Sequence, residues 1–372
     1  MANDKDFLLK NAVEVGKDIK VTLGSITSSD IDLATGNYFA DTLAANTTYT
    51  ISNAGDVQSF QLEVTGGSTA YDLAAATYES KSFNTTKSQT FQIAFDPSGT
   101  KLFTANNDDD RVYEYALSTA WDVSTASYNN LAGIASQEAN ISGLAFKTDG
   151  TKFYIVGTTN ATVYQYSVSS AWSLSGATYE SKSFGISSQA TDPRSIAFSS
   201  DGTKMYMLGF TSSTIYQYTL STAWDVSTAS YDSVSYNSSI FQPYGMFFNP
   251  DGLSFFVLST AYQTITKFSL STAWDLSTAA TTGVSYDSSS EGSASFGLTF
   301  KDDGTNMYVN KNGTVYQYST ATPATVTWPT SIEWAGGVAP SAPAAGETDV
   351  FTFVTDDGGT SYVGLKTADN LS

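Results

Sequence analysis

Leu117-Ser-Thr-Ala-Trp121-Asp-Val-Ser-Thr-Ala-Ser-Tyr128 is the stretch that decides the fold, because similar segments recur three more times along the chain. The tryptophans of the later copies follow Trp121 at intervals of 51, 52 and 50 residues, at Trp172, Trp224 and Trp274. The upstream turn glycines keep nearly the same intervals, at Gly99, Gly150, Gly202, Gly252 and Gly304. Internal similarity at a fixed period of this length is typical of repeat architectures.

Each repeat has the pattern of four β-strands, as the second copy shows. Gly143–Phe146 is a short apolar run, and a tight turn at Asp149-Gly150 separates it from Lys152–Val156. Thr162–Val168 alternates as a half-buried strand should, and Thr178–Phe184 is a more polar fourth strand. No segment keeps a helical period. Four antiparallel strands in about fifty residues, repeated radially, predict a blade of a β-propeller.

The two ends of the array predict how it closes. Thr77–Phe83 matches Thr178–Phe184 almost residue for residue, but it stands before the first complete copy. The fifth copy stops after its third strand, Val315–Tyr318, and has no tryptophan segment. We therefore expect residues 77–84 to supply the fourth strand of the last blade, which removes an exposed sheet edge. The sequence predicts a five-bladed β-propeller over residues 70–320.

The flanks resemble two halves of one further domain. Each is small for an independent core, but residues 21–69 and 321–372 together suffice for a β-sandwich. The strands expected there are Thr47–Ile51, Ser59–Val64, Thr325–Trp328, Ser331–Trp334, and a hairpin of Val350–Val354 and Ser361–Leu365. The fold class predicted is all-β, a propeller inserted into a sandwich, with residues 1–20 as an N-terminal anchoring segment.

Composition excludes several classes of function. The formal net charge is −19 with only 17 Lys and Arg, so nucleic acid and anionic membranes are not expected partners. The chain has no His and no Cys, which removes the usual general base and any thiolate. No apolar run is long enough to span a membrane, and Met1–Lys10 lacks a signal-peptide core.

The repeated residues have structural and functional interpretations. Trp121, Trp172, Trp224 and Trp274 could stack on sugars, but their nearly constant sequence frame favours a structural role between blades. The acidic tip Asn106–Asp110 could bind calcium, but a single hairpin tip of this kind is usually only solvated, so we expect no metal. The predicted innermost strands carry no carboxylate, so we expect neither a glycosidase nor another enzyme, and no cofactor.

The positions that differ between copies are better candidates for binding. The loops that lead into the innermost strands diverge, and one equivalent position just before each such strand is Phe91, Ser142, Arg194, Tyr244 or Phe296. Aromatic side chains and an arginine around a channel mouth could bind a glycan, or they could simply plug the mouth. The candidate ligand-binding residues are Phe91, Arg194, Phe241, Tyr244 and Phe296.

Parts of the chain resemble virion proteins. Phe7-Leu-Leu-Lys-Asn-Ala-Val-Glu-Val-Gly16 resembles the openings of tail-fibre proteins of marine tailed phages. The segments Ala45–Ile51, Phe60–Thr65, Ile332–Gly337 and Asp349–Phe353 resemble a β-sandwich module of phage virion proteins. The Val-Tyr-Gln-Tyr and Leu-Ser-Thr-Ala-Trp-Asp segments are similar to those of propellers in phage and marine bacterial surface proteins.

This resemblance implies a virion structural protein, made in the host cytoplasm and released by lysis. We expect a tail fibre or appendage whose propeller recognises a host receptor or surface glycan. The alternative is a capsid decoration or spacer protein without a ligand, and a polysaccharide-degrading enzyme is the third possibility. Other virion proteins are the expected partners, in a homo-oligomer whose size no heptad pattern specifies.

Overall fold

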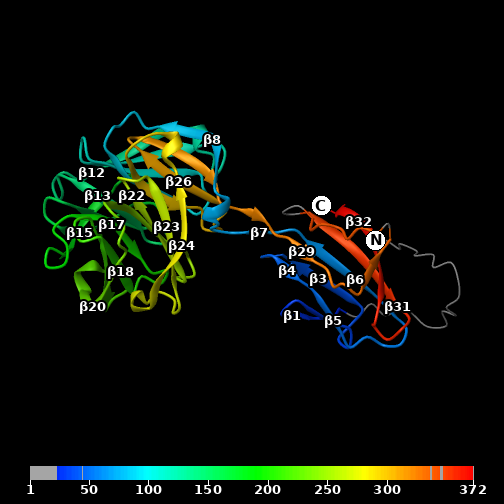
Figure 1. The fold of residues 1–372 in the computed structure, drawn as a ribbon. Coiled ribbons are helices and arrows are strands. Elements are labelled where there is room, and N and C mark those ends of the chain that lie inside the picture. Colours follow the sequence, from blue (N-terminus) through cyan, green and yellow to red (C-terminus); the bar gives the residue numbers. More distant parts are fainter. Residues whose placement is uncertain (1–22, 44, 336, 344–346, 372) are drawn as a thin grey trace. The chain divides into compact units, whose positions relative to one another are not determined.

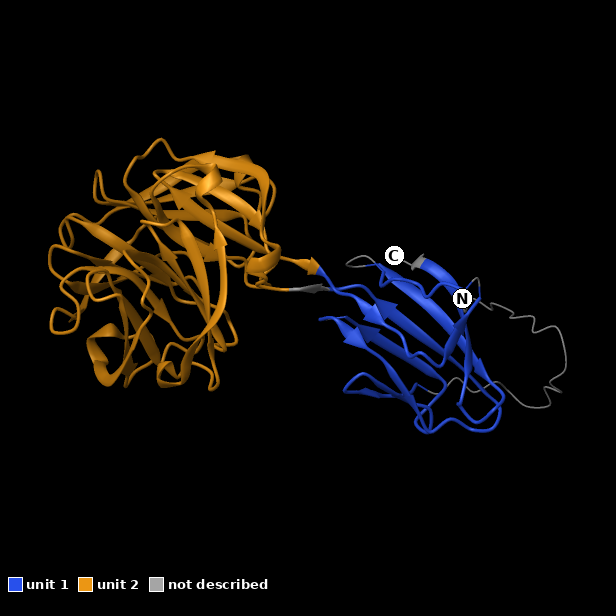
Figure 2. Ribbon diagram, viewed as in Figure 1, with its two compact units in different colours: residues 1–69, 323–372 blue, residues 70–322 orange. Residues whose placement is uncertain are grey.

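The computed structural model describes residues 23–371 except 44, 336 and 344–346. Two compact units divide the chain: residues 1–69 with 323–372 form unit 1, and residues 70–322 form unit 2 (Figure 2). The sequence predicted boundaries at residues 69/70 and 320/321. At the crossings, β7 (Ser68–Thr69) pairs with β28 (Thr322–Pro323). The anchoring segment predicted at residues 1–20 lies outside the described residues.

Unit 2 is all-β and contains five four-stranded antiparallel sheets, a propeller-like arrangement (Figure 1). Sheet 1 contains β9 (Thr90–Phe95), β10 (Lys101–Asn106), β11 (Arg111–Leu117) and β12 (Ala126–Gly133). Sheet 2 contains β13 (Ile141–Phe146), β14 (Lys152–Gly157), β15 (Thr162–Ser167) and β16 (Thr178–Gly185). Sheet 3 contains β17 (Pro193–Phe198), β18 (Lys204–Gly209), β19 (Thr214–Leu220) and β20 (Ala229–Asn237). Sheet 4 contains β21 (Pro243–Phe248), β22 (Ser254–Ser259), β23 (Thr264–Leu270) and β24 (Ala279–Asp287).

Sheet 5 combines segments from both ends of unit 2. Its strands are β25 (Ser295–Phe300), β26 (Asn306–Lys311), β27 (Thr314–Ser319) and, on the outside, β8 (Thr77–Asn84). β8 runs antiparallel to β27, with Tyr78 opposite Tyr318 and Phe83 opposite Val315. Short 3-10 helices complete the unit: η1 (Leu73–Ala75), η2 (Val123–Thr125), η3 (Val226–Thr228), η4 (Leu276–Thr278) and η5 (Ser289–Glu291).

The first strands of the five sheets contact one another in cyclic order. β9 lies beside β13, β13 beside β17, β17 beside β21, β21 beside β25, and β25 beside β9. Glycines permit this close approach. A Cβ on Gly245 would lie 3.0 Å from the Phe296 carbonyl oxygen, and one on Gly297 would lie 2.7 Å from the Phe91 carbonyl oxygen. The innermost strands therefore pack backbone to backbone at these points.

The repeated tryptophans pack on the turn glycines. Gly202 has φ +73°, and a Cβ there would lie 2.2 Å from the Trp224 indole. Gly99, Gly150 and Gly252 meet Trp121, Trp172 and Trp274 in the same way, and Tyr71 takes this place against Gly304. Glycine is thus required in each turn for two reasons. The backbone there is left-handed, and the aromatic ring occupies the space that a Cβ would fill.

Hydrogen bonds to the carbonyl oxygens of the repeated tryptophans and of Tyr71 link each sheet to the next. Hydroxyl groups of three second-strand tyrosines donate to tryptophan carbonyl oxygens: Tyr308 to Trp121 at 2.8 Å, Tyr154 to Trp224 at 2.8 Å and Tyr206 to Trp274 at 2.5 Å. Sheets 1 and 4 have Phe103 and Phe256 at this position. There a lysine replaces the hydroxyl donor: Lys101 donates to Trp172 at 2.7 Å and Lys267 to Tyr71 at 3.2 Å. The five contacts again follow a cyclic order.

Unit 1 is a smaller all-β body built from both ends of the chain. A five-stranded sheet has the order β3 (Tyr38–Thr42), β6 (Gln58–Thr65), β31 (Thr348–Thr355), β32 (Tyr362–Leu371), β30 (Ile332–Trp334). Short ladders are formed by β1 (Ile26–Thr27), β2 (Asp30–Asp32) and β5 (Thr50–Ser52), and by β4 (Thr47–Thr48) with β29 (Val326–Thr327). One apolar core includes residues from both halves, among them Phe39, Phe60, Trp328 and Phe353.

One strand prediction in unit 1 is wrong. Thr47–Ile51 was expected to be a single strand, but it divides at Tyr49 into β4 and β5, which pair in different ladders. Tyr49 is buried, its ring lies 5.5 Å from that of Trp328, and its hydroxyl donates to Asp41 at 2.7 Å. The alternating sequence could not show that the two halves of this segment pair with different strands.

Candidate functional site

Each innermost strand has a β-bulge at its second residue. In sheet 3, Pro193 pairs with Gly209 and Ser195 with Leu208, so Arg194 has no partner in the ladder. The other four sheets skip Phe91, Ser142, Tyr244 and Phe296 in the same way. The sequence had placed this position before the strand, whereas the structure places it inside. A bulge redirects a side chain and interrupts regular pairing. The five bulge residues, one from each sheet, therefore form a set of redirected side chains at the same end of the first strands. We call them the bulge ring.

The three aromatic side chains of the bulge ring pack against one another. Phe91, Tyr244 and Phe296 have centroid separations of 5.2, 5.1 and 4.9 Å, with tilted or edge-to-face geometry. Tyr244 is 7% exposed, while Phe91 and Phe296 are half-buried. Ser142 is buried and donates to the Pro193 carbonyl oxygen at 2.6 Å. The structure thus brings together residues that lie far apart in sequence, and partly covers one end of the inner strands.

Arg194 completes this cluster beside an aromatic residue that the sequence did not single out. Its guanidinium carbon lies 4.9 Å from the ring centroid of Tyr244 and 4.6 Å from that of Phe210. Nε of Arg194 is buried and has no hydrogen-bond partner among the residues that the structure describes. Burial raises the pKa of Tyr244, and the nearby Arg194 charge opposes the rise. A guanidinium held against two rings keeps the edge of its planar group for a ligand.

Phe241 lies in a second aromatic group rather than in this cluster. It is 56% exposed, and its ring centroid lies 5.9 Å from that of Tyr262, which is 64% exposed. Phe241 precedes β21, and Tyr262 lies between β22 and β23, so both are at the end where the innermost strands begin. Sequence reasoning missed Phe210 and Tyr262, because spacing along the chain does not show which loop tips meet.

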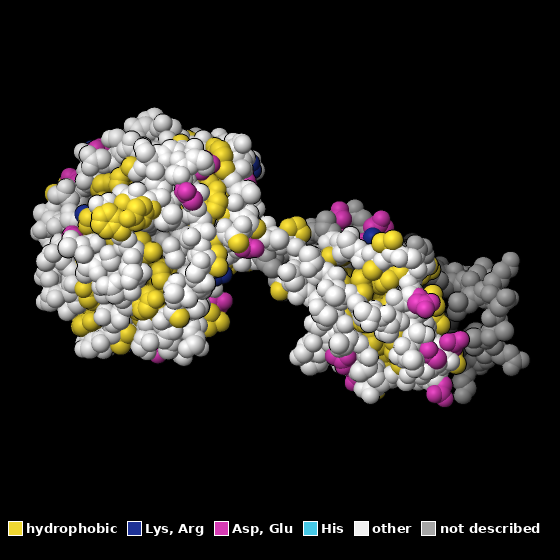
Figure 3. All heavy atoms as spheres, viewed as in Figure 1, with side chains coloured by type: hydrophobic (Ala, Val, Ile, Leu, Met, Phe, Trp, Pro, Cys, Tyr) yellow, Lys and Arg dark blue, Asp and Glu magenta, His cyan; other side chains and the backbone are white. Residues whose placement is uncertain are grey.

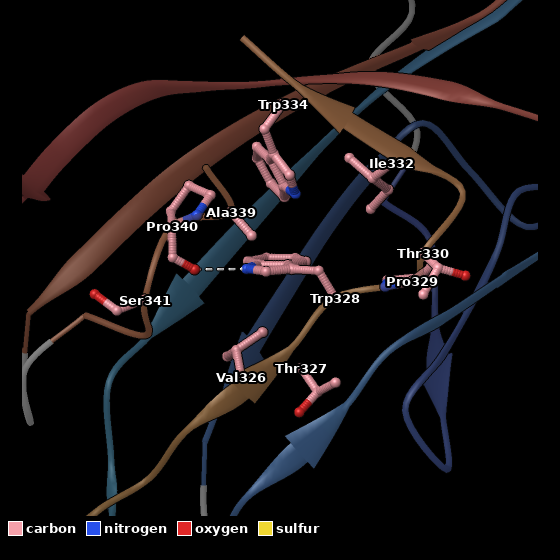
Figure 4. Close-up of a pocket in the computed structure, with 10 residues that line it drawn as sticks. All are labelled: Val326, Thr327, Trp328, Pro329, Thr330, Ile332, Trp334, Ala339, Pro340 and Ser341. Carbon is pink, nitrogen blue, oxygen red and sulfur yellow. Dashed lines mark hydrogen bonds between the residues drawn. The ribbon is translucent and has the colours of Figure 1, made fainter. Parts of the chain in front are cut away.

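Unit 1 has a cavity of about 490 Å³ lined by side chains around two tryptophans (Figure 4). Trp328 is 8% exposed, its Nε1 donates to the Pro340 carbonyl oxygen at 2.8 Å, and its ring lies 5.1 Å from that of Trp334. Pro329, Thr330 and Ile332 also line the cavity. None of the ten lining residues is titratable, so the cavity offers packing surface and hydroxyl groups rather than acid–base chemistry.

A groove of about 670 Å³ runs along sheets 3 and 4 and contains carboxylates. Burial opposes ionisation of Asp232, but hydrogen bonds from Thr219, Gln217 and Lys204 lower its pKa. Lys204 lies 2.9 Å from this carboxylate. Asp275, also in the groove, caps η4 by accepting from the Ser277 amide at 3.0 Å. Both carboxylates hold structural contacts, and the lowered pKa of Asp232 is the opposite of the raised pKa that a glycosidase acid needs.

The acidic tip between β10 and β11 is tied to the neighbouring loop. Lys87 lies 2.9 Å from Asp109, and the Ser88 hydroxyl donates to Asp108 at 2.8 Å. Among the described residues, no group of three or more His, Cys, Asp or Glu side chains is placed to hold a metal ion. No helix in the described part of the chain is both long and apolar enough to cross a membrane.

Comparisons with known proteins assign the chain to no family. No family model and no curated protein matches the chain. Among the solved structures that are similar to the chain, three have a TM-score of 0.40. A candidate 6-phosphogluconolactonase of Bacteroides fragilis is 13% identical, with 56% of this chain and 57% of that chain covered. A protein of unknown function from Desulfotomaculum acetoxidans is 12% identical, with coverage of 76% and 86%. A candidate 6-phosphogluconolactonase of Bacteroides uniformis is 13% identical, with coverage of 62% and 70%.

Proposed function

We propose that this chain is a structural protein of a tailed-phage particle that binds a receptor or glycan on the host surface. We infer that unit 2 is a five-bladed β-propeller inserted into a β-sandwich formed by unit 1. In this account the sandwich and the N-terminal segment attach the protein to other virion proteins, as a tail fibre or appendage. The propeller presents the binding surface.

The bulge ring is the observation that carries the binding proposal. Each repeated Trp packs on the turn glycine of its own sheet, and Tyr154 and Tyr206 donate to Trp carbonyl oxygens of the next sheet, so the scaffold explains why these residues recur. The bulge position recurs in backbone geometry but differs in side chain, with Phe91, Arg194 and Tyr244 among its occupants. The five bulge residues lie at one end of unit 2 and differ in chemistry. This variation favours ligand binding over a role in packing alone.

The surface supports an uncharged ligand. On the face of unit 2 seen in Figure 3, uncharged and hydrophobic side chains predominate and Lys and Arg are few. The chain as a whole carries a net charge of −19, which opposes polyanions. Stacking on aromatic rings together with hydrogen bonds from neutral groups is the chemistry that binds carbohydrate.

Binding of the full chain to host cells tests this proposal. We expect Arg194→Ala to weaken the binding of labelled protein by about tenfold, because the lost guanidinium supplied charge-assisted hydrogen bonds. Arg111→Ala is the matched control, because Arg111 is an arginine of β11 in another sheet and 46% of its side chain is exposed. The control should bind as the wild type does. Wild-type protein that binds no host cells would refute receptor recognition.

A second function, capsid decoration without a ligand, has one observation in its favour. The rings of Phe91, Tyr244 and Phe296 pack against one another. Such packing would also be expected if these residues only plugged the central channel of the propeller. Immunogold labelling of intact particles separates the two functions. Label at the tail supports host attachment, and label in a regular array over the capsid supports decoration.

A further inference from the structure

We propose that Phe241 and Tyr262 form a binding subsite for a neutral pyranose ring. This inference rests on the proposed binding function and names both the ligand class and the place where it binds. Within the described part of the chain, the rings of Phe241 and Tyr262 contact each other and not the aromatic rings of the bulge ring. The subsite is therefore separate from the bulge ring and belongs to sheet 4 alone.

The two rings form an open wedge rather than a packed pair. Their planes meet at 45° with centroids 5.9 Å apart, and each residue is more than half exposed. Tyr128, another exposed aromatic of unit 2, instead has ring contacts with the buried Tyr113 and Tyr115. Keeping two large rings in water costs hydrophobic free energy that a ligand covering them would recover.

One buried serine joins the backbones of the two aromatic residues. The hydroxyl of Ser259, which is 0% exposed, donates to the Phe241 carbonyl oxygen at 2.7 Å and accepts from the Tyr262 amide at 3.2 Å. The Thr260 amide donates to the Gln242 carbonyl oxygen at 3.0 Å and joins the two loops again. These hydrogen bonds fix the backbones of the two loops relative to each other before a ligand binds, which lowers the entropic cost of binding.

This serine link is neutral, whereas each other sheet uses a charged group between the corresponding loops. The charged residues are Asp108, which accepts from Gln89; Glu138, which accepts from Thr159; Asp192, which accepts from Thr211; and Lys311, which donates to Ser288. The loops around the aromatic pair, residues 236–244 and 259–264, contain no charged side chain.

A neutral site of this composition selects a neutral sugar. The two ring faces suit the C–H face of a pyranose, and the amide of Gln242, next to Phe241, can bond its hydroxyls. An anionic polysaccharide would find no cation in either loop and would meet a strongly acidic protein.

Affinity electrophoresis of the full chain through gels that contain polysaccharide tests the subsite. The neutral probes are dextran, galactomannan and glucomannan, and the anionic probes are alginate and dextran sulfate. We expect the wild type to be retarded by at least one neutral probe. Phe241→Ala and Tyr262→Ala should each raise the dissociation constant by about tenfold, because each removes one stacking face. Tyr128→Ala, a matched exposed aromatic on β12, should leave it unchanged.

The outcomes distinguish the subsite from the wider proposal. Both wedge residues are exposed, so thermal unfolding of the variants should match the wild type and show that folding is intact. The subsite is overturned if both Phe241→Ala and Tyr262→Ala still bind the neutral probes as the wild type does. It is also overturned if only the anionic probes retard the wild type. If host-cell binding persists in these cases, the proposed function stands without this subsite. Absence of both polysaccharide and host-cell binding overturns both.

Discussion

Gly202→Ala should destabilise unit 2 strongly, although it adds a single methyl group. The backbone at Gly202 has φ +73°, where an L-residue costs roughly 1–2 kcal/mol. The new Cβ would also lie 2.2 Å from the Trp224 indole, and overpacking of this kind costs about 1–3 kcal/mol. Together these effects lower the free energy of unfolding by about 2–5 kcal/mol. For a unit of this size that is a fall in Tm of about 4–20 °C.

Differential scanning calorimetry measures this effect, with Gly185→Ala as the control. Gly185 ends β16, its φ is not positive, and a Cβ added there would meet no atom within 4 Å. Its substitution should therefore change Tm by about 2 °C or less. Adding Trp224→Ala to Gly202→Ala should remove the collision between Cβ and indole and leave the backbone cost at Gly202. Equal unfolding temperatures for the two glycine variants would refute the proposed packing of indole on turn glycine.

Three further predictions concern a hydrogen bond between sheets, a buried amine and a helix cap. Tyr206→Phe should lower the free energy of unfolding by about 1 kcal/mol, because the Trp274 carbonyl loses its donor, and no change in a denaturation curve would contradict this role. Burial lowers the pKa of Lys311 to about 8, so the unfolded state binds more protons between pH 8 and about 10.4. Stability of the wild type should therefore rise with pH across this window relative to Lys311→Met, and parallel Tm profiles would contradict the burial of a charged amine. Asp225→Ala should cost about 1 kcal/mol, because Asp225 caps η3 by accepting from the Ser227 amide at 3.1 Å, and an unchanged chemical-denaturation midpoint would count against it.

Much of unit 2 follows from local sequence signals. Alternation and turn glycines predicted Lys152–Val156 and Thr178–Phe184, and the strands found are Lys152–Gly157 and Thr178–Gly185. The innermost strands start earlier than predicted, as β13 does at Ile141. The bulge at Ser142 interrupts regular pairing there, and hydrophobic periodicity carries no signal for an extra residue.

The candidate site was only partly visible in the sequence. Alignment of the repeats identified Phe91, Arg194, Tyr244 and Phe296, because a position that diverges within a repeat stands out. Tyr262 could not be found this way, since its contact with Phe241 joins two loops of one sheet. A signal was present in Ser259, where the equivalent residues of sheets 2 and 3 are glycines, but its role needs the geometry of both loops.

Hydrogen–deuterium exchange of the full chain, with and without a bound polysaccharide or host receptor, tests the central claim most directly. The claim is that the divergent end of unit 2 binds and the repeated end supports it. We predict slower exchange on binding in residues 236–244 and 259–264 and at the bulge ring. Protection confined to the repeated tryptophan segments, such as residues 117–125 and 220–228, would contradict the account.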